Sequence, residues 1–176
     1  LGMVPHYFLI RSNNKIDINF FHKIVDYFHN NYPSIKLGAS IYEKEDFLLL
    51  KNLMFQVFQF PYNIFNNYIF KKKKNDIFIA RSIFLQGLLT VNKKIILKKK
   101  ITANYLNNFI KEYFLFLKKN NISPIDICLN YVMMNKQLNN IIVSANNIQQ
   151  LEKIINFKSL DLDVINNVSH FLSNYD

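Results

Sequence analysis

The chain has 176 residues, of which 50% are hydrophobic and 19% are charged, so it can bury a core and lacks the composition of a disordered protein. Its most apolar stretch, residues 47–60, is interrupted by Lys51, Asn52 and two glutamines, which excludes a membrane helix there and predicts no membrane partner. The single cysteine, Cys128, excludes an intrachain disulfide and favours a reducing, cytoplasmic location.

The net charge of +10 raises nucleic acid as a class of partner. However, only Arg11 and Arg81 among the 22 basic residues are arginines, and the chain is also rich in Asn, Ile, Phe and Tyr. That mixture is typical of a drift toward AT-rich codons, which raises basicity without selection for a ligand. A groove that binds single-stranded nucleic acid combines basic and aromatic residues. The lysine runs at residues 71–74 and 98–100 are not interleaved with aromatic residues in this way. We therefore expect no nucleic-acid partner, and the alternative, binding driven by charge, predicts steep salt dependence.

Apolar periodicity and turn signals predict strands that alternate with helices. In chain order we expect a strand at residues 4–10, a helix from Asp17 closed by Asn30, Asn31 and Pro33, a strand at 35–42, a short helix at 43–50, a strand at 54–60, a short helical stretch at 62–70 and a strand at 76–82. After a lysine-rich connection at 91–102, we expect a helix at 102–120, a helix that Ser123-Pro124 begins, a strand at 140–144, a helix from Asn147 and a last helix near 160–172.

This alternation is typical of βαβ units and a parallel sheet in one α/β domain spanning residues 1–176. A closed (β/α)8 barrel has eight strands and typically ~250 residues, whereas about five strands are predicted here. Periodicity alone leaves open a partial barrel and an open doubly wound sheet. The only glycines, Gly2, Gly38 and Gly87, exclude a glycine-rich phosphate loop and a dinucleotide fingerprint.

Four segments carry a resemblance to a known family. They are KLGASIY at residues 36–42, FQFPYNI at 58–64, ARSIFLQGLL at 80–89, and IIVS at 141–144 followed by Gln150. In this order they resemble the fifth to eighth strands of aldo-keto reductases, which are nicotinamide-dependent oxidoreductases. The resemblance implies a partial (β/α)8 TIM barrel, roughly its last five βα units, with residues 4–11 as the fourth strand. We expect the first three strands to be missing, in a fragment or in a truncated protein.

The resemblance also implies a site for NADP or NAD at the carboxyl ends of the strands, and it leaves the choice between the two open. Gln59 matches the residue that hydrogen-bonds the nicotinamide carboxamide, and Ser40 matches the serine that ends the fifth strand. Arg81 stands where other members stack an aromatic ring on the nicotinamide. The remaining matched positions are Ser82, Phe84 and Gln86, at the loop that contacts the pyrophosphate, and Asn146 and Gln150, at the adenosine end.

The implied reaction is the interconversion of a small-molecule carbonyl and an alcohol. The family's catalytic Asp, Tyr and Lys lie on strands that precede these residues, and Arg11 occupies the position of its histidine. Arginine cannot shuttle a proton, although it can polarise a carbonyl oxygen. We therefore assign no catalytic residue in this chain. The alternative is a catalytically inactive remnant that binds nucleotide or self-associates, because an open half-barrel exposes strand edges; its partner is then a second copy or the missing N-terminal half.

The remaining candidates for chemistry are four histidines and Cys128. His22 and His29 are seven residues apart, and His6 and His170 have no companion at ligand spacing, so no metal site is predicted. Cys128 lies within an apolar helical pattern and is expected to be a core residue.

Overall fold

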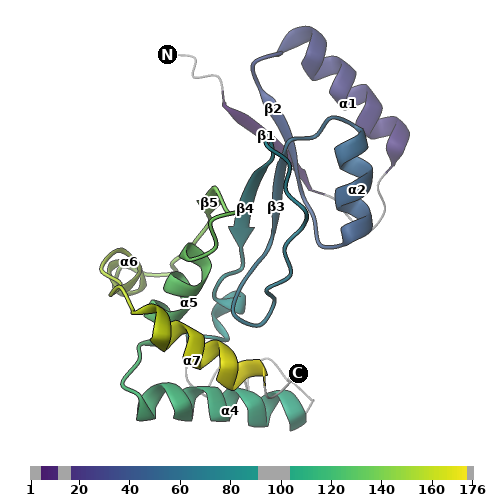
Figure 1. The fold of residues 1–176 in the computed structure, drawn as a ribbon. Coiled ribbons are helices and arrows are strands. Elements are labelled where there is room, and N and C mark those ends of the chain that lie inside the picture. Colours follow the sequence, from purple (N-terminus) through teal and green to yellow (C-terminus); the bar gives the residue numbers. More distant parts are fainter. Residues whose placement is uncertain (1–4, 12–16, 91–103, 174–176) are drawn as a thin grey trace. The chain divides into compact units, whose positions relative to one another are not determined.

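A computed structural model describes residues 5–11, 17–90 and 104–173 (Figure 1). The chain divides into two compact units, which we describe separately. The sheet unit holds the described residues up to Pro61 together with Tyr68–Arg81 and Gln137–Ile141. The helical unit holds Tyr62–Asn67 and the described parts of Ser82–Lys136 and Ile142–Asp176. The lysine-rich connection predicted at residues 91–102 lies outside the described residues, and the assignment of residues 1–176 to one domain stays a prediction.

The sheet unit contains five parallel strands, whose order in the sheet is their order in the chain. This confirms the parallel α/β fold that the alternation predicted. The strands are β1 (Tyr7–Arg11), β2 (Lys36–Ser40), β3 (Val57–Pro61), β4 (Ile77–Arg81) and β5 (Asn140–Ile141). Consecutive parallel strands need crossover connections, which here include helices α1 (Ile18–Asn31) and α2 (Lys44–Asn52).

Helices α1 and α2 lie on the same side of the sheet (Figure 1). The ring of Phe28 on α1 contacts that of Phe8 on β1, with 4.8 Å between the centroids. Phe47 on α2 contacts Phe58 on β3 at 4.8 Å and Phe78 on β4 at 6.0 Å. Because successive side chains of a strand point to opposite faces, these contacts identify the helix-covered face and leave the next residue of each strand on the other face.

An ion pair joins α2 to the segment that precedes β4. The ammonium group of Lys51 contacts the carboxylate of Asp76, and the two side chains are only 12% and 5% exposed. The same carboxylate accepts a hydrogen bond from the backbone N–H of Lys73 at 2.7 Å. Burial of a charge is tolerated where a partner and hydrogen bonds compensate for lost water, so this pair depends on both members.

The helical unit contains α4 (Asn104–Lys119), α5 (Pro124–Met133), α6 (Ile148–Ile155), α7 (Leu162–Ser173) and the short 3-10 helix η1 (Leu85–Gly87). Its core includes Ile110, Tyr113, Ile127 and Val168. Cys128 is buried in this core, where its sulfur lies 3.9 Å from the hydroxyl of Tyr113, and burial raises the pKa of its thiol to about 12. The prediction that Cys128 is a core residue is confirmed. Among the described residues, no helix is both long and apolar enough to cross a membrane.

Two sequence predictions differ from the structure. The helical stretch predicted at residues 62–70 is wrong, because the chain is irregular there. The side-chain oxygen of Asn63 accepts hydrogen bonds from the backbone N–H groups of Phe65 and Asn66, each at 3.0 Å. Asparagine bonded in this way competes with the helical ladder and favours a turn. The strand predicted at residues 140–144 is also shorter, since only Asn140–Ile141 pair with β4.

Candidate functional site

Three polar side chains form a row across the carboxyl ends of β1, β2 and β3. Arg11 is the register partner of Ser40, and Ser40 is the register partner of Gln59. Register partners in a parallel sheet point to the same face, so the three side chains share the face opposite α1 and α2. Arg81 on β4 lies two residues beyond Ile79, the partner of Gln59, and therefore belongs to that face as well.

The row of polar side chains follows an apolar layer on the same face of the sheet. Val57, Ile77 and Ile79 form a small buried cluster on the same face, and Leu9 packs against it. Gly38 lies between Leu9 and Val57 in the register. A β-carbon on Gly38 would lie 2.5 Å from the carbonyl oxygen of Val57, so glycine allows β2 and β3 to approach closely just before the row. The Gly-x-Ser sequence thus combines a close strand contact with a polar side chain two residues later.

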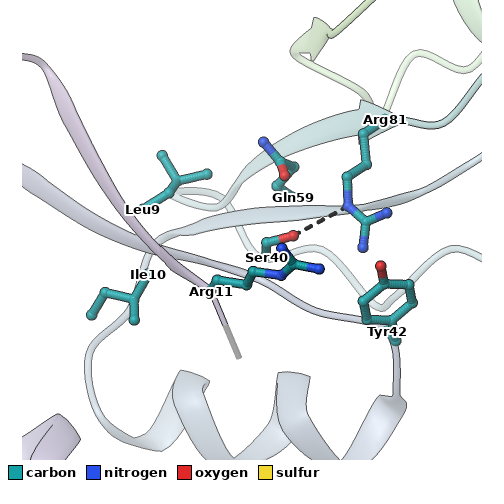
Figure 2. Close-up of a pocket in the computed structure, with 7 residues that line it drawn as sticks. All are labelled: Leu9, Ile10, Arg11, Ser40, Tyr42, Gln59 and Arg81. Carbon is teal, nitrogen blue, oxygen red and sulfur yellow. Dashed lines mark hydrogen bonds between the residues drawn. The ribbon is translucent and has the colours of Figure 1, made fainter. Parts of the chain in front are cut away.

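The guanidinium of Arg81 is held by neutral groups from β2 and the residues that follow it. Its Nε donates a hydrogen bond to Ser40 Oγ at 3.1 Å, and one terminal nitrogen lies 3.5 Å from the carbonyl oxygen of Ile41. The centre of the guanidinium lies 4.2 Å from the centroid of the Tyr42 ring (Figure 2). A cation over an aromatic face is attracted by the ring quadrupole, so Tyr42 helps to orient Arg81.

These side chains line a pocket of about 390 Å³ at the carboxyl end of the sheet (Figure 2). The described residues that line it are Leu9, Ile10, Arg11, Ser40, Tyr42, Gln59 and Arg81. They include two cations and no carboxylate, together with hydroxyl and amide groups that both donate and accept hydrogen bonds. A concave site with a few convergent polar groups is the usual form of a small-molecule site.

The sequence model of the Aldo/keto reductase family matches residues 40–170. The chain belongs to this family. Among solved structures it is similar to the apo form of an aldo-keto reductase from Bacillus halodurans, with 14% identity and a TM-score of 0.67 over 94% of this chain. The chain spans 61% of the length of that protein. No curated protein matches the chain. The similarity of structure, together with the parallel sheet, confirms the predicted partial TIM barrel.

The structure places Arg11, Ser40, Gln59 and Arg81, which are far apart in the sequence, around one pocket. Their roles toward a cofactor or substrate stay predictions. The other five predicted residues, Ser82, Phe84, Gln86, Asn146 and Gln150, belong to the helical unit. Their assignment to the same cofactor stays a prediction.

The loop after β4, which the resemblance assigned to the pyrophosphate, has an unusual backbone. Ser82, Leu85 and Gln86 have positive φ angles of 56°, 46° and 54°, and Gly87 follows with 85°. Non-glycine residues in this region cost on the order of 1–3 kcal/mol each and cluster at functional sites. The backbone N–H of Leu85 donates to the carbonyl of Ser82 at 2.9 Å, which helps to hold the loop in this form.

At the start of α6, the two residues predicted for the adenosine end contact each other. The backbone N–H of Asn146 donates to the amide oxygen of Gln150 at 2.8 Å, while the backbone N–H of Gln150 donates to Asn147 Oδ1 at 2.9 Å. These two hydrogen bonds form a capping arrangement in which Asn147 is the cap residue and Gln150 binds back to the residue before it, so that backbone donors at the helix start are satisfied. Gln150 therefore has a local structural role in addition to the one that the aldo-keto reductase resemblance implies.

Of the described residues that line the pocket, Leu9, Ile10 and Tyr42 were not predicted as site residues, and Tyr42 is the one of the three that contacts Arg81. It is 56% exposed and lies two residues after the end of β2, although the strand predicted at residues 35–42 included it. An aromatic residue just beyond the carboxyl end of a barrel strand was the available signal. As for metals, no group of three His, Cys, Asp or Glu side chains gathers to hold an ion in the part of the chain that the structure describes.

Proposed function

We propose that the chain forms the nicotinamide-binding part of an NADP- or NAD-dependent oxidoreductase that acts on a carbonyl or alcohol substrate. The observation that carries the proposal is the pairing of Ser40 with Gln59 at the carboxyl ends of β2 and β3, within one pocket. Barrel enzymes place their sites at this end of the strands.

The residues present fit a nicotinamide carboxamide. That group has one carbonyl acceptor and one NH2 donor, and the side-chain amide of Gln59 offers the complementary pair. The hydroxyl of Ser40 adds a second donor and acceptor, although it already accepts a hydrogen bond from Arg81. Gln59 is partly buried, so its hydrogen bonds to a ligand would be sheltered from water.

The guanidinium of Arg81 and the ring of Tyr42, which contact each other, lie beside Ser40 and Gln59 (Figure 2). A guanidinium is planar and stacks on other planar groups, which suits a position next to an aromatic ring. We assign Gln59 and Ser40 to the carboxamide and Arg81 to stacking or to a nearby phosphate. Ser82, Phe84, Gln86, Asn146 and Gln150 are proposed to contact the rest of the dinucleotide.

When bound, the cofactor would supply or accept the hydride. The side chains described above would bind and orient the nicotinamide, and Arg11 at the edge of the row would polarise a carbonyl oxygen by its charge. Because an arginine side chain cannot shuttle a proton, Arg11 favours the alternative, a chain that binds nucleotide without turnover.

The test is titration of the 176-residue chain with NADPH and NADH, followed by the fluorescence of the reduced nicotinamide. Gln59→Leu should weaken binding about tenfold, because the carboxamide of the ligand loses its partner in a partly dry pocket. The matched control is Gln56→Leu, which changes the same residue type just before β3, at the other end of the sheet. Absence of binding by either cofactor, or equal affinities for the two variants, would refute the proposal. Binding without oxidation of NADPH by added aldehydes would select the inactive alternative.

A further inference from the structure

The two arginines of this chain line the same pocket. Of the 22 basic residues, 20 are lysines, and none of those lysines is among the described residues that line the pocket. Arg11 and Arg81 are 70 positions apart in the sequence, on β1 and β4. Both arginines of a chain that otherwise uses lysine for positive charge therefore lie at one site.

Guanidinium and ammonium groups differ in the ligands that they bind. The guanidinium presents a rigid fork of donors that matches the two oxygens of a carboxylate or phosphate, whereas an ammonium acts as a point charge. Several contacts orient the guanidinium of Arg81, since its Nε donates to Ser40, a terminal nitrogen lies 3.5 Å from the carbonyl oxygen of Ile41, and the group rests on Tyr42. These contacts hold the guanidinium of Arg81 in one orientation within the pocket (Figure 2).

Arg11 supplies the second fork. Its side chain is exposed, and it makes no ion pair with any residue that the structure describes. Because Arg11 is the register partner of Ser40, its side chain extends into the same pocket as Ser40, the residue that Arg81 contacts (Figure 2). Two like charges at one concave site repel each other, and the described lining has no carboxylate to offset them. An anion bound between them would remove that repulsion.

We propose that Arg11 and Arg81 together bind an anionic oxygen group, a phosphate or a carboxylate, of the ligand that occupies this pocket. The inference rests on the proposed function, in which that ligand is the nicotinamide cofactor or its carbonyl substrate. The anion has two possible sources, the phosphate beside the nicotinamide ribose and an acidic group on the substrate. Both share the chemistry that a pair of guanidiniums recognises.

The experiment compares two pairs of probes by calorimetry or saturation-transfer NMR on the 176-residue chain. Nicotinamide mononucleotide and nicotinamide riboside differ by one phosphate on the cofactor side. Glyceraldehyde 3-phosphate and glyceraldehyde differ by one phosphate on the substrate side. The variants are Arg11→Gln, Arg11→Lys and the control Lys36→Gln, which removes one exposed charge from the opposite end of β2. Circular dichroism verifies that each variant folds.

We expect the natural chain to prefer the phosphorylated member of at least one pair by about tenfold or more, the usual size of a charge-assisted hydrogen bond. Arg11→Gln should abolish that preference, so that the phosphorylated and unphosphorylated members of the pair bind about equally. Arg11→Lys should restore only part of it, because lysine keeps the charge without the fork. Lys36→Gln should preserve it. The pair that shows the preference identifies the source of the anion.

No preference in either pair, or an equal loss in Lys36→Gln and Arg11→Gln, would overturn the inference. Its failure is distinguishable from failure of the proposed function. If Gln59→Leu weakens nicotinamide riboside while Arg11→Gln changes nothing, the nicotinamide site stands and the anion site falls. If nicotinamide riboside does not bind but the preference for glyceraldehyde 3-phosphate depends on Arg11, the anion site stands without the nicotinamide.

Discussion

Replacement of Gly38 by alanine tests the close approach of β2 and β3 that positions the site. Glycine to alanine in a strand ordinarily stabilises a protein by about 0.4–1 kcal/mol, because alanine lowers the entropy of the unfolded chain. Here the added β-carbon would lie 2.5 Å from the Val57 carbonyl oxygen and 2.6 Å from the Val57 β-carbon, both well inside van der Waals contact. Backbone atoms cannot rotate away as the end of a side chain can, so the strands must separate.

Overpacking of this kind costs about 1–3 kcal/mol, which leaves a net destabilisation of about 1–2 kcal/mol after the entropic gain. For a chain of this size the expected fall in melting temperature is roughly 3–8 °C. The separation occurs two residues before Ser40 and Gln59, so the affinity for NADPH should fall as well. Thermal unfolding followed by circular dichroism measures the first effect, and fluorescence titration the second. A melting temperature that rises in Gly38→Ala would refute the close contact, because it is the result expected when nothing opposes the added methyl group.

Two further predictions concern the core. Lys51→Met should lower the free energy of unfolding by about 3–5 kcal/mol in urea titrations, because it leaves the carboxylate of Asp76 buried without its partner. The control Lys44→Met, on the same helix, should change the free energy of unfolding by no more than about 0.5 kcal/mol. Equal effects of the two substitutions would mean that the ion pair contributes nothing specific. Cys128 should resist iodoacetamide at pH 8.5 in the folded chain, because a pKa raised to about 12 by burial keeps the thiol protonated, and should react at least about a hundredfold faster in denaturant. Rapid alkylation of the folded chain would contradict the burial of this thiol.

Much of the fold is predictable because local signals agree with the tertiary structure. Asp17 was expected to begin a helix, and its carboxylate accepts hydrogen bonds from two backbone N–H groups at the start of α1. Ser123 and Pro124 were expected to begin another, and they occupy the cap and first turn of α5. The prediction of a helix at residues 62–70 was wrong because it relied on apolar spacing that is compatible with a helix. In the structure the side chain of Asn63 instead accepts hydrogen bonds from the backbone, which favours a turn.

The functional site, like the fold, could be predicted from the sequence only in part. Ser40, Gln59 and Arg81 lie near the carboxyl ends of predicted strands, and they come together because parallel strands bring these ends to one edge. Tyr42 ends the strand predicted at residues 35–42, but its contact with Arg81 was not predictable, since it depends on the direction in which the Arg81 side chain turns 39 positions later in the chain. Such a contact is set by tertiary packing, which no local pattern specifies.

In the function proposed above, a nicotinamide ring occupies the pocket bordered by Ser40 and Gln59. Intermolecular nuclear Overhauser effects between the ring protons of bound NADP and side-chain protons of the chain measure this most directly. We expect cross-peaks from the nicotinamide protons to the side-chain amide of Gln59 and the β-protons of Ser40. Cross-peaks at saturating ligand that instead reach Phe58 or Phe78, on the helix-covered face, would contradict it.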